Sequence, residues 1–259
     1  MPELTQVRLQ RDGARATLTF LRPAELNALS PTLIAEAQRC VSSVAQSDAG
    51  VLVLAAEGRS FSAGVDLKAV SSPDYTPEVA RLFSEQARDL IRQLETMPQV
   101  TIARVTGHCF TGGLEVALGC DFIVAAQDAV FADTHAKLGF RAGWGLSQRL
   151  PRRIGLMRAK EMSFTARRVS AAQAVELGLI LDAVPAEALD RRIDDLVSAV
   201  TENSAGSIAA YKVLYDKAQN EGLEAGLTFE ATVKLPIADR EARLGATTRR
   251  LGSGSGPAN

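Results

Sequence analysis

Three short apolar runs, separated by helix-like segments, constrain the fold of this chain of 259 residues most strongly. They are VLVLAAEG from residue 51, TIARVTGHCF from residue 101 and FIVAA from residue 122. Runs of strand length without polar alternation are typical of strands buried on both faces. The segment EVARLFSEQARDLIRQLETM, by contrast, repeats apolar residues at helical spacing. Strands separated by helices pair in parallel through crossover connections, so the pattern predicts an α/β layer architecture.

The N-terminal part carries its own folding signals. VRLQ and ATLTF flank RDGA with alternating apolar residues, which predicts an opening hairpin. Ser30 followed by Pro31 predicts the start of a helix, with the serine as N-cap and the proline in the first turn.

The C-terminal part has a helical pattern. Two segments, from about Ser204 to Gln219 and from about Glu224 to Leu244, carry apolar stripes that need something to pack against, and a subunit partner would supply it. We expect a core in residues 1–199, a helical region in residues 200–251 and a flexible, glycine- and serine-rich tail in residues 252–259.

Charge and cysteine content exclude several classes of protein. There are 29 basic and 30 acidic residues, so the broad positive field that drives nucleic-acid binding is missing. The longest stretch free of charged residues is ten residues, against the roughly 20 that a membrane-spanning helix needs. MPELTQVRLQRDG does not resemble a signal peptide. Three cysteines without metal-ligand spacing suit a reducing compartment, so we expect a cytoplasmic protein without a metal site.

Two turns of small residues have the same construction, a buried strand before them and a short helix after them. In Ser62-Ala63-Gly64 the backbone amides can approach a ligand without side-chain obstruction. Thr111-Gly112-Gly113 places free amides at a helix N-terminus. Two such amides converging on one oxygen would form an oxyanion hole. A glycine turn before a helix is also common for reasons of chain geometry alone.

Glu115 lies in the first turn of the short apolar helix that follows the second of these turns. A carboxylate at this place gains from the helix dipole but requires partners when it is buried. A capping-box glutamate and a catalytic acid or base are both compatible with this position. The residues alone leave the two interpretations open.

Taken together, these segments resemble a known family. FSAGVDLK, residues 61–68, and VTGHCFTGGLEVALGCD, residues 105–121, resemble the two signature segments of the crotonase (enoyl-CoA hydratase/isomerase) superfamily. RPAELNALS, GWGLSQRLPRRIG and AVELGLI extend the similarity over most of the chain. The resemblance implies a crotonase-type spiral of repeated β-β-α units, with a C-terminal helical region that mediates trimers, often paired into hexamers. It also implies an acyl-CoA substrate and no separate cofactor, because CoA is part of the substrate.

The resemblance also assigns site residues by position. The backbone amides of Ala63 and Gly112 would form the oxyanion hole for the thioester carbonyl. Asp66 and Leu67 would lie along the path of CoA, and Gly143 aligns with a glycine that helps to hold the reacting water. Trp144, the only tryptophan, would fill the core or form a wall of the acyl pocket.

The two acid–base positions of the hydratases fall on Glu115 and on residue 135. Here the chain departs from the family, because His135 stands where a second glutamate is usual. A histidine with a pKa near ~6.5 can exchange a proton at neutral pH. Asp133 lies two residues earlier and would share a face with His135 in an extended segment, orienting the ring.

These assignments favour an enzyme, an enoyl-CoA hydratase. It would add water to a trans-2-enoyl-CoA through a stabilised thioester enolate, with Glu115 as acid–base and His135 in place of the second glutamate. Two alternatives stay open: an enoyl-CoA isomerase that uses Glu115 alone, and a weakly catalytic acyl-CoA-binding protein. RNA binding, known for some relatives, is disfavoured by the near-neutral charge.

Overall fold

The main sheet forms the centre of the molecule. The computed structural model describes residues 4–253, and within them the sheet has six strands in the order β1-β2-β3-β4-β6-β9. The β1–β2 pair is antiparallel and the other neighbours are parallel, which confirms the predicted α/β architecture. The strands are β1 (Val7–Asp12), β2 (Arg15–Phe20), β3 (Val51–Ala56), β4 (Val100–Val105), β6 (Phe122–Ala126) and β9 (Asp182–Val184).

A second, smaller sheet has the order β5-β7-β8. Its strands are β5 (His108–Phe110), β7 (Val130–Ala132) and β8 (Val169–Ser170). The run TIARVTGHCF, expected as one strand, is therefore divided between the two sheets. Gly107 separates β4 from β5 at a φ of +54°, and a β-carbon there would lie 1.9 Å from the Arg59 carbonyl oxygen. The chain turns at this glycine and carries β5 toward the site.

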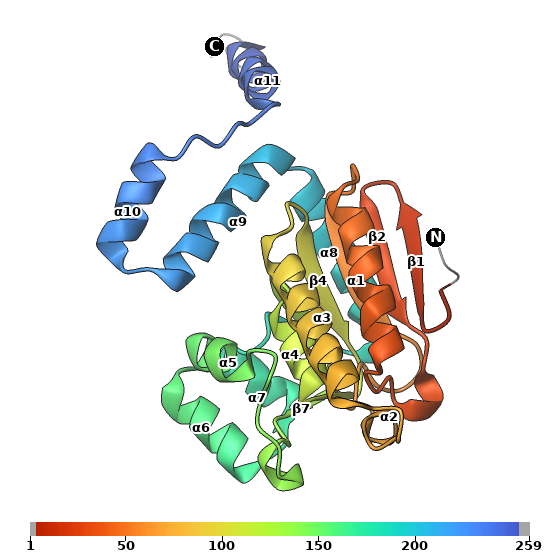
Figure 1. The fold of residues 1–259 in the computed structure, drawn as a ribbon. Helices are drawn as coiled ribbons and strands as arrows, with labels where there is room; N and C mark the ends of the chain where they lie inside the picture. The colour runs from red at the N-terminus through yellow and green to blue at the C-terminus, as the bar shows by residue number, and fades with distance from the viewer. Residues whose placement is uncertain (1–3, 254–259) are drawn as a thin grey trace.

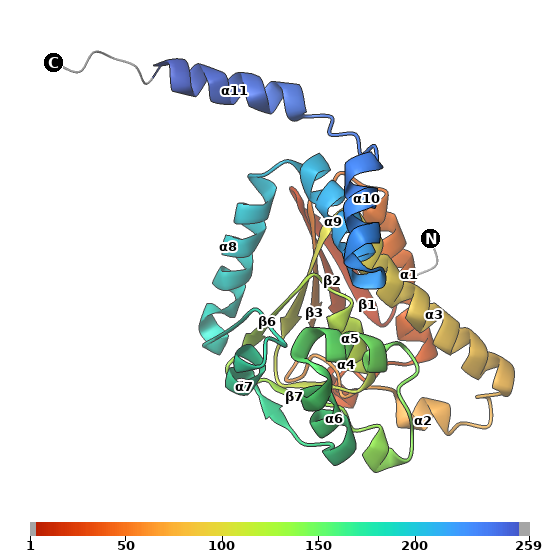
Figure 2. The same ribbon diagram turned by 90° about the vertical axis from the view of Figure 1, so that its left-hand side faces the viewer.

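Helices cover both faces of the main sheet. Figures 1 and 2 show α1 and α3 on one face and α8 on the other. The first helices are α1 (Pro31–Ala45), α2 (Leu67–Val70), α3 (Pro77–Thr96) and α4 (Gly112–Leu118). They are followed by α5 (Leu146–Ile154), α6 (Leu156–Thr165), α7 (Ala171–Glu176) and α8 (Leu189–Thr201). Short 3-10 turns are η1 (Pro23–Glu25), η2 (Ala136–Leu138) and η3 (Ala186–Ala188).

Strand β3 shows why its sequence is apolar throughout. Leu52 and Leu54 point into the large core that contains α1 and α3, whereas Val51 and Val53 point into a second cluster beneath α8. Successive side chains of a strand face opposite sides, so a strand covered on both sides has no polar position.

The predicted start of the first α-helix is confirmed. Ser30 caps α1 by accepting a hydrogen bond from the Leu33 amide, and Pro31 occupies the first turn. The hairpin of β1 and β2 closes around Asp12 and Gly13, as expected.

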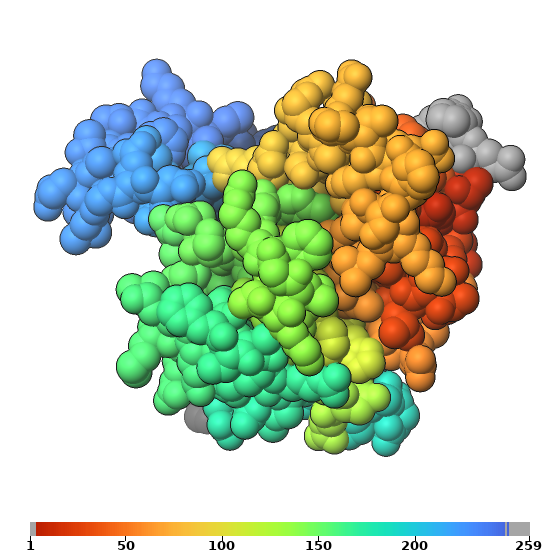
Figure 3. Space-filling view, turned by 60° about the horizontal axis from the view of Figure 1, so that its bottom comes forward, coloured from red at the N-terminus to blue at the C-terminus, as the bar shows by residue number. Residues whose placement is uncertain are grey.

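The C-terminal helices extend away from the core. They are α9 (Ala205–Asn220), α10 (Leu223–Thr232) and α11 (Arg240–Ser253). Figure 3 shows the blue C-terminal segment projecting at one side of the molecule. The prediction of a single helix from about Glu224 to Leu244 was wrong, because the chain leaves the helical conformation around Pro236, which lacks an amide hydrogen and disfavours helical backbone before it.

Two details of this region bear on the expected domain division. The predicted tail begins too early, because Gly252 and Ser253 belong to α11, while residues 254–259 lie outside the described residues. The division of core and helical region at residue 200 stays a prediction. Helix α9 is tied to the core by Lys212, whose ammonium group donates to the Asp121 carboxylate at 2.5 Å and to the Gln99 carbonyl at 2.9 Å.

Among the described residues, none of the helices has the length and apolar character needed to cross a membrane.

Glu36 provides a test of how the N-terminal strand is held. Its buried carboxylate accepts hydrogen bonds from the amides of Thr5, Gln6 and Val7, at 2.8 to 3.2 Å. Burial would raise the pKa of Glu36, but these bonds outweigh it and lower the pKa below 4.5. We expect Glu36→Gln to lower the free energy of unfolding by about 1–3 kcal/mol at pH 7, because the amide group leaves buried donors unpaired.

Urea unfolding at several pH values would measure this loss. The carboxylate has a lowered pKa in the folded state, so its stabilisation is present above pH 4.5 and is lost as the pH falls through the folded-state pKa. The difference between wild type and variant should therefore shrink in acid. Glu85→Gln removes an exposed carboxylate paired with Arg81 and should change stability little. Equal losses in both variants at pH 7 would contradict the assigned role of Glu36.

Candidate active site

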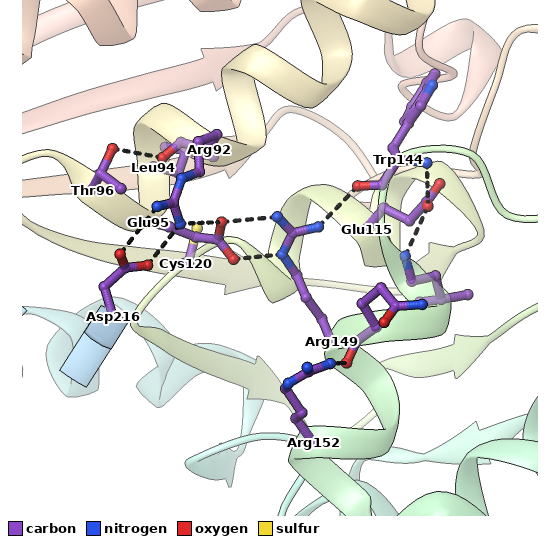
Figure 4. Close-up of polar contacts among 12 residues, drawn as sticks. Arg92, Leu94, Glu95, Thr96, Glu115, Cys120, Trp144, Arg149, Arg152 and Asp216 are labelled. Carbon is purple, nitrogen blue, oxygen red and sulfur yellow. Dashed lines mark hydrogen bonds and ion pairs between the residues drawn. The ribbon is translucent and has the colours of Figure 1, made fainter. Parts of the chain in front are cut away.

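Glu115 lies in a helix that is buried along its whole length. Every residue of α4 is buried, and the Glu115 side chain is only 2% exposed. Its Oε1 atom accepts hydrogen bonds from the backbone amides of Trp144 at 2.9 Å and Leu146 at 3.1 Å, as Figure 4 shows. Position in the first turn of α4 also favours a negative charge. The two amides thus hold the carboxylate through Oε1, and Oε2 accepts neither of these hydrogen bonds.

The structure brings His135 to the second oxygen of Glu115. The distance from His135 Nε2 to Glu115 Oε2 is 3.9 Å. On the other side of the ring, Nδ1 lies 2.6 Å from Asp133 Oδ1, and the same oxygen accepts the His135 amide at 3.1 Å. The expected Asp133–His135 pair is confirmed. Its geometry differs, because His135 has helical backbone angles at the start of η2 rather than an extended conformation.

Burial and charge act in different ways on these three groups. Burial raises the pKa of Glu115 above 4.5, and the Leu146 and Trp144 amides and the charge of His135 oppose this rise. Burial alone would lower the pKa of His135, but the hydrogen bond to Asp133 and the nearby carboxylates outweigh it and raise the pKa above 6.5. Asp133 is buried too, yet hydrogen bonds from His135 and Ser163 lower its pKa below 3.8. The arrangement favours an imidazolium between two carboxylates.

The two small-residue turns lie against each other, as their common construction suggested. A β-carbon on Gly64 would lie 1.9 Å from Thr111 Oγ1, and one on Gly113 would lie 2.6 Å from Ser62 Cβ. Ser62 also forms a parallel bridge with Cys109. Glycine at these two positions therefore permits a close approach that any larger residue would prevent.

Thr111 has the strained backbone of this region. Its φ of +43° lies in a region that favours glycine, and such a conformation costs on the order of 1–3 kcal/mol in a non-glycine residue. It precedes Gly112, whose amide lies ahead of the first intrahelical hydrogen bond of α4, from the Glu115 amide to the Thr111 carbonyl. The strained residue thus directs the start of α4, where Gly112 can donate to a ligand.

The amide of Ala63 is not available in the way the sequence suggested. It donates to the Leu26 carbonyl at 3.0 Å, so it is engaged within the chain. Two residues later, the Val65 amide donates to no protein group within residues 4–253. The geometry therefore argues against Ala63 and in favour of Val65 as the donor from this turn. The motif in the sequence could not show which amide is already in use.

Asp66 serves the local structure of the turn. Its carboxylate caps α2 by accepting the amides of Lys68 and Ala69, and it forms an ion pair with Arg22 at 2.7 Å. Asp66 is buried, whereas Leu67 is exposed beside it. A contact of either residue with CoA stays a prediction.

The loop before α5 contains the other expected residues. Gly143 is exposed, and a β-carbon there would meet no atom within 4 Å, so the space beside it is open. Trp144 is buried and packs edge-on against Phe83, with ring centroids 5.2 Å apart. The indole also covers Gly112, where a β-carbon would lie 2.7 Å from it. Trp144 is thus both part of the core and a wall next to the expected oxyanion donor.

The backbone donors to Glu115 were not predicted. The amides of Trp144 and Leu146 come from the loop before α5 and from the first residue of that helix, where the only sequence signal is a pair of glycines on either side of a tryptophan. Within the described part of the chain, no cluster of three or more His, Cys, Asp or Glu residues could hold a metal ion.

The chain is similar in sequence and in structure to proteins named enoyl-CoA hydratase. A family model described as enoyl-CoA hydratase/isomerase matches residues 11–250. The short-chain-enoyl-CoA hydratase of Clostridium acetobutylicum is 29% identical over 232 residues, which cover 88% of each chain. The crystal structure of enoyl-CoA hydratase from Bacillus anthracis has a TM-score of 0.89 at 28% identity, over 95% of this chain and 97% of that one. A Thermobifida fusca protein, solved in complex with acetoacetyl-CoA, has a TM-score of 0.81 at 28% identity, over 93% and 95% of the two chains.

A titration of the two histidines would test the charge arrangement. His135 should titrate above pH 6.5, and Asp133→Asn should lower its pKa, because the substitution removes a negative charge and the ionic hydrogen bond. Proton NMR of the imidazole signals measures both. His108, which contacts Ser60, is the only other histidine and serves as an internal control.

The same pair predicts a pH dependence of stability. A raised pKa in the folded state means that the His135 contribution is fully present below pH 6.5 and is lost as the pH rises through the folded-state pKa. The loss of stability in Asp133→Asn should accordingly be smaller in alkali than at pH 6. An unchanged His135 titration in the variant would contradict the pairing.

Proposed function

Because the chain belongs to the enoyl-CoA hydratase/isomerase family, we propose that it adds water across the double bond of a trans-2-enoyl-CoA. The observation that carries this proposal is the facing pair of Glu115 Oε2 and His135 Nε2, 3.9 Å apart. The fold is that of crotonase-type enoyl-CoA hydratases, and the relatives are enzymes named for this lyase reaction.

The spacing of the pair suits one water molecule. With a water oxygen about 2.8 Å from both atoms, the angle from Glu115 Oε2 through the water oxygen to His135 Nε2 is about 90°, which two hydrogen bonds to one water can accommodate. The water would donate to Glu115 Oε2 and accept from the protonated His135 Nε2. Because Glu115 is held by backbone amides and His135 by Asp133, both partners are fixed before the water arrives.

The protonation states of Glu115 and His135 assign each residue a role. The water oxygen attacks the β-carbon while the Glu115 carboxylate accepts a proton from the water. The His135 imidazolium donates its proton to the α-carbon, so the net change is addition of water. The pair holds one proton in total before and after the reaction. Because the two groups interact, their apparent pKa values belong to the pair and not to either residue alone. A raised pKa of His135, caused by its carboxylate neighbours, supports the donor role.

The negative charge of the intermediate falls on the thioester oxygen. Amides of Gly112 and Val65, from the two turns that lie against each other, would donate to this oxygen. Each such donor can contribute on the order of a hundredfold or more in rate. The strained backbone of Thr111 supports this role, since it fixes the direction of the next amide.

The substrate class is a CoA thioester. The Thermobifida fusca protein with the same fold was solved with acetoacetyl-CoA, which supports a CoA site in this chain. The turn with Asp66 and Leu67 lies next to the proposed Val65 donor, so CoA would pass along it. Gly143, beside open space, would face the reacting water. Trp144 over Gly112 narrows the acyl side of the site.

A homotrimer, or a hexamer of paired trimers, would give the C-terminal helices a partner. Large apolar residues on α9, α10 and α11 are exposed, and α9 and α10 have no buried residue. They include Tyr211, Tyr215, Leu223, Leu227 and Leu244. Such stripes favour burial against another copy of the chain.

A kinetic comparison of the two acid–base residues tests the function. We expect wild type to hydrate a short trans-2-enoyl-CoA, and Glu115→Gln and His135→Gln to lose about 10²–10⁴-fold in kcat/KM, because each removes one proton transfer. The wild-type rate should fall as the pH rises through the His135 pKa, which lies above 6.5, and this limb should vanish in His135→Gln. Thioester absorbance and product identity are the measurements.

His108→Gln is the matched control and should keep wild-type kinetics, because this histidine contacts Ser60 away from the carboxylate pair. If the enzyme converts a 3-enoyl-CoA, and this conversion requires Glu115 but not His135, the reaction is isomerisation instead. Such a one-base reaction has a structural basis, since Oε2 of Glu115 receives none of the amides that hold Oε1. Binding of acyl-CoA without turnover of either substrate would overturn the enzyme assignment.

A further inference from the structure

Arg149 lies behind the Glu115 carboxylate and touches the loop that holds it. Its Nη1 donates to the Trp144 carbonyl at 2.9 Å. On its other side, the guanidinium forms a two-pronged ion pair with Glu95, through Nε to Oε1 and through Nη2 to Oε2 at 2.8 Å. Figure 4 shows the resulting chain of contacts from Glu95 through Arg149 to the loop residues that donate to Glu115.

The peptide that Arg149 holds lies between the two donors to Glu115. The Trp144 carbonyl belongs to the peptide that joins Trp144 to Gly145. The Trp144 amide precedes this peptide and the Leu146 amide comes after it, and both donate to Glu115 Oε1. A rotation of the held peptide would therefore turn at least one donor away from the carboxylate.

The backbone of Gly145 leaves the Arg149 guanidinium room that a side chain would occupy. Its φ is +110°, and a β-carbon there would lie 1.9 Å from Arg149 Nη1. Arg149 thus packs directly on the glycine backbone. The fork of an arginine can bind a carboxylate with two bonds and still reach a carbonyl, which the single ammonium of a lysine cannot reproduce.

We propose that Arg149 is a positioning residue for Glu115, which it orients by clamping the Trp144–Gly145 peptide against Glu95. Arg149 contacts neither the Glu115 carboxylate nor His135 directly. It acts through the loop, and its effect on the reaction rests on the proposed function of Glu115.

The clamp also reaches the C-terminal helical region. Arg92 lies 3.7 Å from Glu95 and forms a two-pronged pair with Asp216 of α9, at 2.7 and 3.0 Å. Glu95 therefore sits between the arginine that holds the loop and the arginine that holds α9 (Figure 4). The docking of α9 and the orientation of the loop share one carboxylate.

The test compares Arg149→Met with Arg152→Met. Both remove an arginine of α5 that donates to a backbone carbonyl, but Arg152 is exposed and, within residues 4–253, its guanidinium donates only to the Gln148 carbonyl. We expect Arg149→Met to lower kcat by about tenfold to a hundredfold, as small misplacements of reacting groups do, with KM changed less than about twofold. Arg152→Met should match wild type.

A pH profile separates positioning from mere loss of structure. The loop amides lower the pKa of Glu115, so weaker bonds in Arg149→Met should move the acid limb of kcat/KM to higher pH. Arg149→Lys should recover part of kcat, since it retains a donor and the charge. An unshifted acid limb with unchanged kcat in folded Arg149→Met would overturn the proposal.

A measurement that needs no substrate tests the Arg149 clamp separately from the proposed enzyme activity. Trp144 is the only tryptophan and is 6% exposed, so acrylamide quenching of its fluorescence reports the loop alone. Quenching should increase in Arg149→Met and in Glu95→Gln but not in Arg152→Met. If wild type turns over no enoyl-CoA, the proposed function fails, while unchanged quenching would separately overturn the clamp. Should Arg149→Met not fold, Arg149→Lys and Glu95→Gln provide the same comparison.

Discussion

The enclosure of the Glu115 carboxylate is the constraint on which the site depends. A carboxylate with 2% of its surface exposed must be satisfied by the protein. Hydrogen-bond donors come from the loop before α5 and from Leu146, the first residue of that helix, so this stretch needs the unusual backbone of Gly145 and the clamp of Arg149. Charge balance comes from His135. Burial of one group thus determines the shape of a loop, the place of a glycine and the choice of a facing side chain.

Much of the fold could be predicted because periodicity and capping act locally. The buried strand β3, the opening hairpin and the cap at Ser30 are all encoded by residues adjacent in sequence. The two errors have different causes. The division of β4 from β5 depends on a close contact of Gly107 with a distant segment, whereas the break near Pro236 has a local cause, the proline itself, in a pattern whose apolar periodicity alone would continue. Local patterns record which residues are apolar but not where the chain leaves one layer for the next.

In the site, side chains could be predicted better than backbone groups. Glu115, His135 and Asp133 carry their chemistry in their residue types, and the structure places them together. The donors are backbone amides, which every residue except proline possesses, and their availability depends on tertiary contacts. The engaged amide of Ala63 and the unengaged amide of Val65 differ only in that respect.

The two acid–base residues stand on elements of very different character. Glu115 belongs to a helix sealed inside the core, whereas His135 begins a short turn whose next residues are exposed. A substitution at position 135 removes the contacts with Asp133 and Glu115, while one at position 115 affects the loop, the clamp and the core together. Because only Glu115 stands on the sealed helix, the group at position 135 is the one whose replacement changes the proton donor while the inner carboxylate and its supporting loop keep their places.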